Sequence, residues 1–289
     1  MLAAAALLAS ACGATGSAGQ NGTLTQPRRG SSPPTASRPT SHPGSTAPAR
    51  RSGTSTSTST STSSTTTTTA ALSGDATVLE IGDSLGEDLG FGMAWALSTD
   101  ASVHLIQDAK GDTGLVNEAY YDWPEHLSAE LAQYHPEILV VFLGGNDVQN
   151  FFDGSTLETV GSPGWDAGYG ARVGKMMDEA TAAGSRVIWV GMPVMSDPAF
   201  SAHMAAFDAI YQREAAAHEG VTYFSSWPIF SGATGQYVAT RVVNGQSVTL
   251  RDPDGIHLDF GGADLLGAAV VKEMDHLYGL EAVPPTSIP

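Results

Sequence analysis

Residues 138–147 read ILVVFLGGND, and this stretch decides the class of fold that the sequence predicts. Its first six residues form a continuous apolar run that is rich in β-branched side chains. Such a run indicates a strand that is buried on both faces, as the strands of a parallel sheet are. The two glycines, the asparagine and the aspartate that follow are typical of a turn at the end of a strand.

Four further apolar runs predict strands, at residues 77–81, 103–107, 186–190 and 221–224. Helix-like segments alternate with them, at residues 123–134, 171–183, 199–218 and 262–278. This alternation predicts an α/β fold, a three-layer α/β/α sandwich around a mainly parallel sheet of about five strands. Two β-rich runs meet at Asn244-Gly245 within residues 237–250, and we expect an appended β-hairpin there.

Composition divides the chain into unequal parts. Residues 20–72 consist almost entirely of Ser, Thr, Pro, Gly, Ala and Arg, which predicts a disordered linker. Residues 73–289 form the predicted folded domain, and they hold all 30 acidic residues of the chain. A surface that acidic repels phosphate groups, so we expect no nucleic-acid partner.

The N-terminus predicts export. Residues 2–11 (LAAAALLASA) form a short apolar run that ends in small residues before Cys12, the one cysteine of the chain. This resembles the end of a bacterial lipoprotein signal, in which that cysteine becomes lipidated. We therefore expect a signal over residues 1–19, a membrane tether through the N-terminus, and an extracellular or cell-surface domain. The alternative is an ordinary cleaved signal, with Cys12 incidental.

Polar segments follow the predicted strands, at the edge where parallel sheets bind their ligands. They are residues 82–85 (GDSL), 110–115 (KGDTGL) and 144–147 (GGND), and residues 252–258 (DPDGIHL) follow the predicted hairpin. Each segment alone would be read as a turn or a helix cap. Together they supply a serine, a glycine, an asparagine and an Asp-x-x-His pair, which points to nucleophilic catalysis.

These segments resemble the motif blocks of the SGNH hydrolases, also called GDSL-like lipases and esterases. The matching residues are Gly82, Asp83, Ser84 and Leu85 for the first block, Gly111 for the second, residues 144–147 for the third, and Asp254 with His257 for the last. The resemblance extends over residues 77–278 and implies an SGNH, flavodoxin-like sandwich with no cofactor and no catalytic metal. Of the remaining histidines, one lies in the linker (His42), one alternates within a strand (His104), and five lie on helices or helix ends, where we expect a surface role (His126, His135, His203, His218 and His276). No pair of them has a spacing typical of metal ligands, so we expect no metal site.

Roles for the matched residues follow from the resemblance and from the chemistry. Ser84 would be the nucleophile, His257 its base, and Asp254 the acid that orients His257. Asp252 is a rival for the last role, but the spacing favours Asp254.

The backbone N–H groups of Ser84 and Gly111 and the amide of Asn146 would form an oxyanion hole, with Gly114 as a substitute for Gly111. We read Asp83 and Asp147 as structural, holding their loops through hydrogen bonds to backbone N–H groups.

Residues 148–169 are long for a connection and contain Phe151, Phe152, Trp165 and Tyr169. These aromatic side chains either line an acyl or sugar site or cover the edge of the sheet.

We expect a monomeric, secreted serine esterase that acts on short acyl esters of small molecules or carbohydrates. The alternatives are an O-acyltransferase with the same triad, and an inactive carbohydrate-binding or scaffold protein.

Overall fold

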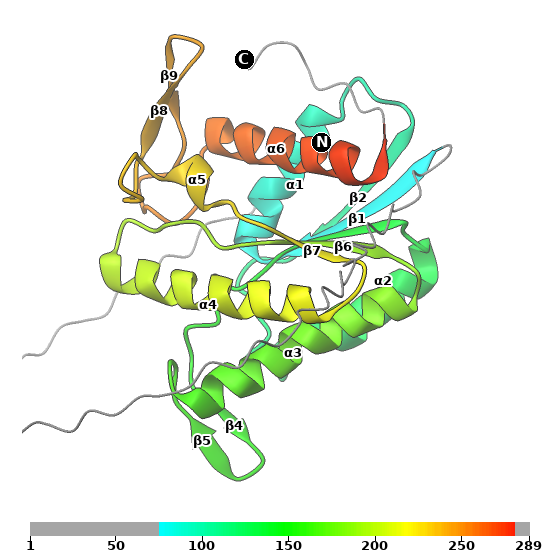
Figure 1. Ribbon diagram of the computed structural model, residues 1–289, viewed down its shortest axis with the longest axis vertical. Coiled ribbons are helices and arrows are strands. Elements are labelled where there is room, and N and C mark those ends of the chain that lie inside the picture. The colour runs from blue at the N-terminus through cyan, green and yellow to red at the C-terminus, as the bar shows by residue number, and fades with distance from the viewer. Residues whose placement is uncertain (1–74, 281–289) are drawn as a thin grey trace, which may run out of the picture. The chain divides into compact units, whose positions relative to one another are not determined.

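The computed structural model of the protein describes residues 75–280 (Figure 1). The predicted signal (1–19), the predicted linker (20–72) and Cys12 lie outside the described residues. Within the described range, no helix is both long enough and apolar enough to cross a membrane.

A five-stranded parallel sheet forms the centre of the fold. In spatial order its strands are β2 (Val103–Ala109), β1 (Ala76–Gly82), β3 (Ile138–Phe142), β6 (Arg186–Val190) and β7 (Val221–Phe224). Each contains or overlaps a predicted run, so the predicted α/β class is confirmed. The chain goes out from β1 to β2 and then returns to β3 on the other side of β1. The switch point of the sheet, where ligands of such folds bind, therefore lies between β1 and β3.

Helices cover both faces of the sheet and complete the three predicted layers (Figure 1). One face is covered by α1 (Ser84–Ala96) and α6 (Phe260–Tyr278). The other is covered by α2 (Trp123–Tyr134), α3 (Pro163–Ala182) and α4 (Pro198–Ala217). The short helix α5 (Trp227–Phe230) precedes the C-terminal hairpin.

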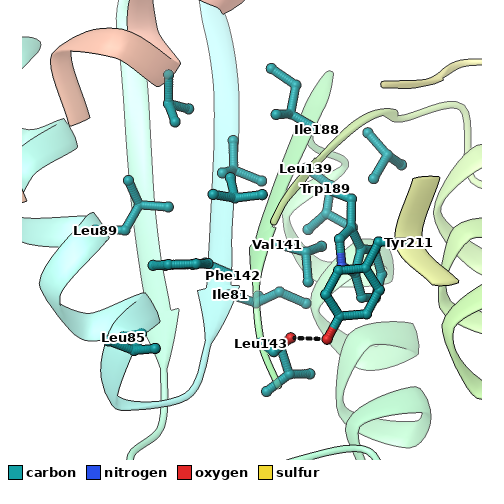
Figure 2. Close-up of a cluster of buried hydrophobic side chains, with 14 of the residues drawn as sticks. Ile81, Leu85, Leu89, Leu139, Val141, Phe142, Leu143, Ile188, Trp189 and Tyr211 are labelled. Carbon is teal, nitrogen blue, oxygen red and sulfur yellow. Dashed lines mark hydrogen bonds between the residues drawn. The ribbon is translucent and has the colours of Figure 1, made fainter. Parts of the chain in front are cut away.

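The core lies between these layers, and β3 is buried along its whole length. Figure 2 shows Leu85 and Leu89 of α1 on one side of the sheet, and Trp189 with Tyr211 on the other. Tyr211 donates a hydrogen bond from its hydroxyl to the carbonyl oxygen of Leu143 (3.0 Å), so the aromatic layer is attached to the end of β3.

Helices α1 and α6 touch through their backbones. A Cβ atom at Gly92 of α1 would lie 1.9 Å from the carbonyl oxygen of Ala263, and one at Gly267 of α6 would lie 2.1 Å from the carbonyl carbon of Gly92. No side chain fits at either position. The two helices therefore pack closer than larger residues would allow, and their N-terminal ends have a fixed separation.

The predicted hairpin at residues 237–250 is present as β8 (Thr240–Val243) and β9 (Gln246–Thr249). Asn244 and Gly245 both have positive φ (51° and 81°), as a type I′ turn requires. This hairpin forms a two-stranded sheet of its own beside the main sheet.

The segment that the sequence suggested as one long connection is more ordered than expected. It contains a second hairpin, β4 (Phe151–Asp153) with β5 (Thr156–Glu158), and α3 begins at Pro163 rather than at residue 171. Ser162 caps this helix, because its Oγ accepts the N–H of Trp165 (3.1 Å). Proline is tolerated at the first helical position, so the local signal for an earlier start was present.

Glu80 is a charged residue type inside the core. It is fully buried on β1, and neither carboxylate oxygen has a hydrogen-bond partner among the described residues. Glycine on α1 makes room for it, since a Cβ atom at Gly90 would lie 2.8 Å from Glu80 Oε2. Burial raises the pKa of Glu80 well above its usual value, and the nearby charges of Asp108, Asp83 and Glu87 raise it further.

The raised pKa predicts how the stability of the protein depends on pH. Folding binds a proton at Glu80, so this residue costs stability increasingly as the pH rises from the unfolded pKa towards the folded one. We expect Glu80→Gln to increase the free energy of unfolding at pH 8, and the gain to shrink towards pH 4. Urea unfolding at the two pH values measures this. Glu219→Gln, at an exposed position, is the control, and an equal gain in both variants would contradict the prediction.

Candidate active site

Ser84 is the first residue of α1, and Asp83 alone separates it from the end of β1. The turn before it is tight, because a Cβ atom at Gly82 would lie 2.2 Å from the carbonyl oxygen of Phe142 at the end of β3. Glycine is therefore required where the ends of β1 and β3 approach each other. As the first helical residue, Ser84 has no acceptor for its N–H within α1.

Asp83 joins the turn after β1 to the loop after β3. Its Oδ1 accepts the N–H of Leu85 (2.9 Å), and its Oδ2 accepts the N–H groups of Gly144 (3.0 Å) and Gly145 (2.7 Å). Burial raises the pKa of this carboxyl to about 6, although the three backbone hydrogen bonds act in the opposite direction. Asp83 thus has the structural role that the sequence suggested.

Asp147 joins the loop after β3 to the loop after β2. Its two oxygens accept the N–H groups of Leu115 (3.0 Å) and Val116 (2.9 Å), and Tyr169 donates its hydroxyl to Oδ2 (2.8 Å). The loops after β1, β2 and β3 are therefore connected through two buried carboxylates, as expected from the sequence.

The structure brings Ser84, His257 and Asp254 together in one hydrogen-bonded line. His257 Nε2 lies 2.9 Å from Ser84 Oγ, and His257 Nδ1 lies 2.6 Å from Asp254 Oδ2. Asp254 Oδ1 also accepts the backbone N–H groups of Ile256 (2.8 Å) and His257 (3.0 Å). Asp254, and not Asp252, is the carboxylate that contacts the imidazole.

The charges of this pair reinforce each other. Burial acts to raise the pKa of Asp254, but hydrogen bonds from His257 and the loop backbone lower it to about 2. Burial acts to lower the pKa of His257, but the hydrogen bond and charge of Asp254 raise it above its usual 6.5. Asp254 is therefore ionised at neutral pH and stabilises the imidazolium form of His257.

Asn146 and Gly111, two of the expected oxyanion donors, already have hydrogen-bond partners of different kinds. Asn146 donates one amide hydrogen to the carbonyl oxygen of Thr113 (2.9 Å), which fixes the side chain beside the second motif. The N–H of Gly111 is directed at Glu87 Oε1 (2.9 Å) on the first turn of α1. Gly114, the substitute, packs under Asp147, whose Oδ1 would lie 2.2 Å from an added Cβ atom.

Glu87 and Asp88 belong to the site, although they lie outside the four motif segments. They stand three and four residues after Ser84 on α1, so they share its side of the helix, and that spacing was the available signal. Asp88 Oδ2 accepts the N–H of Leu258 (2.8 Å), which holds the residue next to His257. Burial raises the pKa of Asp88 to about 6, while the N–H of Leu258 and the charge of His257 lower it.

Arg251 supports the loop that carries the acid and the base. The residue is 2% exposed, and its guanidinium donates hydrogen bonds to the carbonyl oxygens of Val194 (3.0 Å), Ile256 (2.5 Å) and Gly255 (3.4 Å). The guanidinium also lies 5.1 Å from the centre of the Phe230 ring. Such a buried fork of donors fixes the backbone between Asp254 and His257.

Three of the four aromatic residues suggested for substrate binding do not have that role, because they are buried. Trp165 and Tyr169 are buried (1% and 0% exposed) and stack at 4.7 Å between ring centres, so they belong to the core and cannot line a site. Phe151 is buried under the guanidinium of Arg172, and Phe152 alone is exposed, at 67%. The amphipathic α3 turns the first two inward, which their spacing of four residues would have indicated.

The sheet order and the position of the hydrogen-bonded Ser, His and Asp at its switch point define the SGNH hydrolase fold. The chain belongs to the family described as "Protein of unknown function (DUF459)", whose model matches residues 77–273. No curated protein sequence matches the chain.

Solved structures with a similar fold include two hydrolases. An α/β hydrolase from the metagenome of Lake Arreo, Spain, is 12% identical with a TM-score of 0.53, over 72% of this chain and 97% of that one. An acetylxylan esterase from Geobacillus stearothermophilus is 13% identical with a TM-score of 0.51, over 70% of this chain and 95% of that one. The similarity at this level of identity is one of fold.

The contact between Asp254 and His257 predicts a measurable titration. We expect the pKa of His257 to lie above 6.5, and Asp254→Asn to lower it, because the charge that favours imidazolium is removed. Histidine Cε1–H signals in an NMR pH titration report it, with His257→Gln used for assignment. Asp252→Asn is the control and should lower this pKa less. An equal effect of the two variants would disprove the assignment of Asp254.

The buried contacts of Arg251 predict a large loss of stability on substitution. Arg251→Lys removes the guanidinium and leaves buried carbonyl groups without donors. This loss should lower the free energy of unfolding by on the order of 3 kcal/mol. Arg241→Lys is the matched control, since Arg241 also donates hydrogen bonds to two carbonyl oxygens but is only half-buried. Urea unfolding of both variants would show the difference, and equal losses would contradict the assigned role of Arg251.

Proposed function

We propose that this protein is a serine hydrolase that cleaves carboxylic esters through an acyl-enzyme on Ser84. The observation that carries the proposal is the hydrogen-bonded line from Ser84 Oγ through His257 to Asp254. A serine hydroxyl is a weak nucleophile at neutral pH and becomes effective when a base accepts its proton.

Each residue of the line has one task. With Nδ1–H donated to Asp254, the free Nε2 of His257 accepts the proton of Ser84 as Oγ attacks the ester carbonyl. Asp254 stabilises the imidazolium that forms. His257 then gives the proton to the leaving alcohol, and the acyl group remains on Ser84.

The tetrahedral intermediate needs donors for its oxyanion. The N–H of Ser84 and the second amide hydrogen of Asn146 would serve this task, since Asp83 holds the loop that carries Asn146 against the turn that carries Ser84. Gly111 would contribute its N–H once the substrate displaces the carboxylate of Glu87 from it. One such donor is typically worth about 3 kcal/mol in the transition state.

Solvent access favours hydrolysis over acyl transfer. The side chains of His257 and Asp254 are 38% and 45% exposed, so water reaches the base beside the acyl-enzyme. An acyltransferase on the same triad must keep water from this position. An inactive binding protein would have no use for the complete line of hydrogen bonds.

Short acyl esters on carbohydrate are the substrates we propose. The open surface around the triad suits a small acyl group on a bulky alcohol, and the acetylxylan esterase with the same fold acts on such esters. Export and a lipid-anchored tether, the expectations from residues 1–72, complete the proposal and place the domain near cell-surface or environmental polysaccharides.

Hydrolysis of p-nitrophenyl acetate by the full chain tests the proposal. We expect activity that falls by roughly a thousandfold or more in Ser84→Ala, because the nucleophile is lost. Ser98→Ala, at an exposed serine beyond the end of α1, should keep the activity of the parent. Equal rates in Ser84→Ala and the parent, with both folded by circular dichroism, would disprove the assignment of Ser84.

A further inference from the structure

Three side chains with metal-ligand atoms meet away from the triad. Asp108 stands near the end of β2, and His126 and Glu130 lie on α2. One possible ligand atom from each residue lies within 4.8 Å of the other two. All three residues are half-buried, and their side chains remain reachable from solvent. Because His126 and Glu130 are four residues apart on a helix, they point to the same side.

The imidazole of His126 is fixed in orientation. Its ring centre lies 5.1 Å from that of Tyr121 and 5.7 Å from that of Trp123, with the ring planes steeply inclined. Trp123 is fully buried and donates its Nε1–H to Thr113 Oγ1 (3.1 Å). Little side-chain freedom is therefore left for an ion to remove on binding.

Negative charge is in excess at this cluster. Asp108 pairs with His126, and two carboxylates share this one imidazole. Asp108 and Glu130 carry the same charge and offer ligand atoms within 4.8 Å of each other, so they repel. A bound cation would remove this repulsion.

We propose that Asp108, His126 and Glu130 bind a divalent transition-metal ion of the Zn²⁺ type. One imidazole nitrogen and two carboxylate oxygens form a ligand set that suits Zn²⁺ or Mn²⁺ better than Ca²⁺ or Mg²⁺. Zn–N and Zn–O distances of about 2.0–2.2 Å require ligand atoms roughly 3.3 Å apart. The three ligand atoms lie within 4.8 Å of one another, so binding requires the side chains to move closer together.

The fold suggests what the ion does. Asp108 and His126 stand at the two ends of the segment that carries Gly111 and Thr113, and β2 is an edge strand of the sheet. An ion between them closes this loop and connects β2 to α2, which stabilises the folded state most where the loop is otherwise free. The ion is structural and does not take part in ester cleavage.

The test uses the full chain without an affinity tag, treated with EDTA and then freed of the chelator. Isothermal titration with ZnCl₂ should show a high-affinity site at one ion per chain, and Zn²⁺ should raise the melting temperature. His126→Gln and Glu130→Gln should each weaken that site at least about tenfold, since a ligand is removed.

The controls separate this site from others. His104→Gln, at an exposed histidine of the same strand, should bind Zn²⁺ as the parent does. So should Ser84→Ala, which makes the outcome independent of esterase activity. Should His126→Gln be unstable, Glu130→Gln gives the same information from a position on the helix surface. Absence of one-to-one binding, or unchanged binding in Glu130→Gln, would overturn the proposal.

Discussion

The contact between α1 and α6 is the constraint on which the site depends. Gly92 and Gly267 let the two helix backbones touch, and nothing larger than glycine fits there. Helix α1 begins with Ser84, and α6 begins at Phe260, shortly after His257. The nucleophile and the base are 173 positions apart in the sequence, yet their reacting atoms lie 2.9 Å apart. The reason is that the helix that Ser84 begins and the helix that His257 precedes are held together.

Buried charges carry this geometry into the loops. Asp83 joins the loops after β1 and β3, Asp147 joins those after β3 and β2, and Arg251 clamps the segment between Asp254 and His257. Each is fully or almost fully buried, and most of its hydrogen bonds go to backbone groups. Backbone hydrogen bonds fix loop positions more closely than contacts between flexible side chains do. The partly exposed residues of the triad are thus supported by a buried network of hydrogen bonds.

Several features had a local signal that competing signals concealed. The early start of α3 was marked by Ser162 and Pro163, within a segment that was expected to be one long connection. Trp165 and Tyr169 have helical spacing and therefore point into the core, where they stack. The hairpin of β4 and β5 has strands of three residues each, too short for alternation to be visible in the sequence.

The sequence by itself determined the strands, the order of the motifs and the identities of Ser84, Asp254 and His257. These properties are local: apolar periodicity sets the strands, and the motif residues stand next to each other or three apart. Only the tertiary structure decided that Glu87 meets Gly111, that Arg251 supports the catalytic loop, and that Asp108 meets His126. Such contacts join distant segments, and they depend on strand order and helix packing, which no local pattern contains.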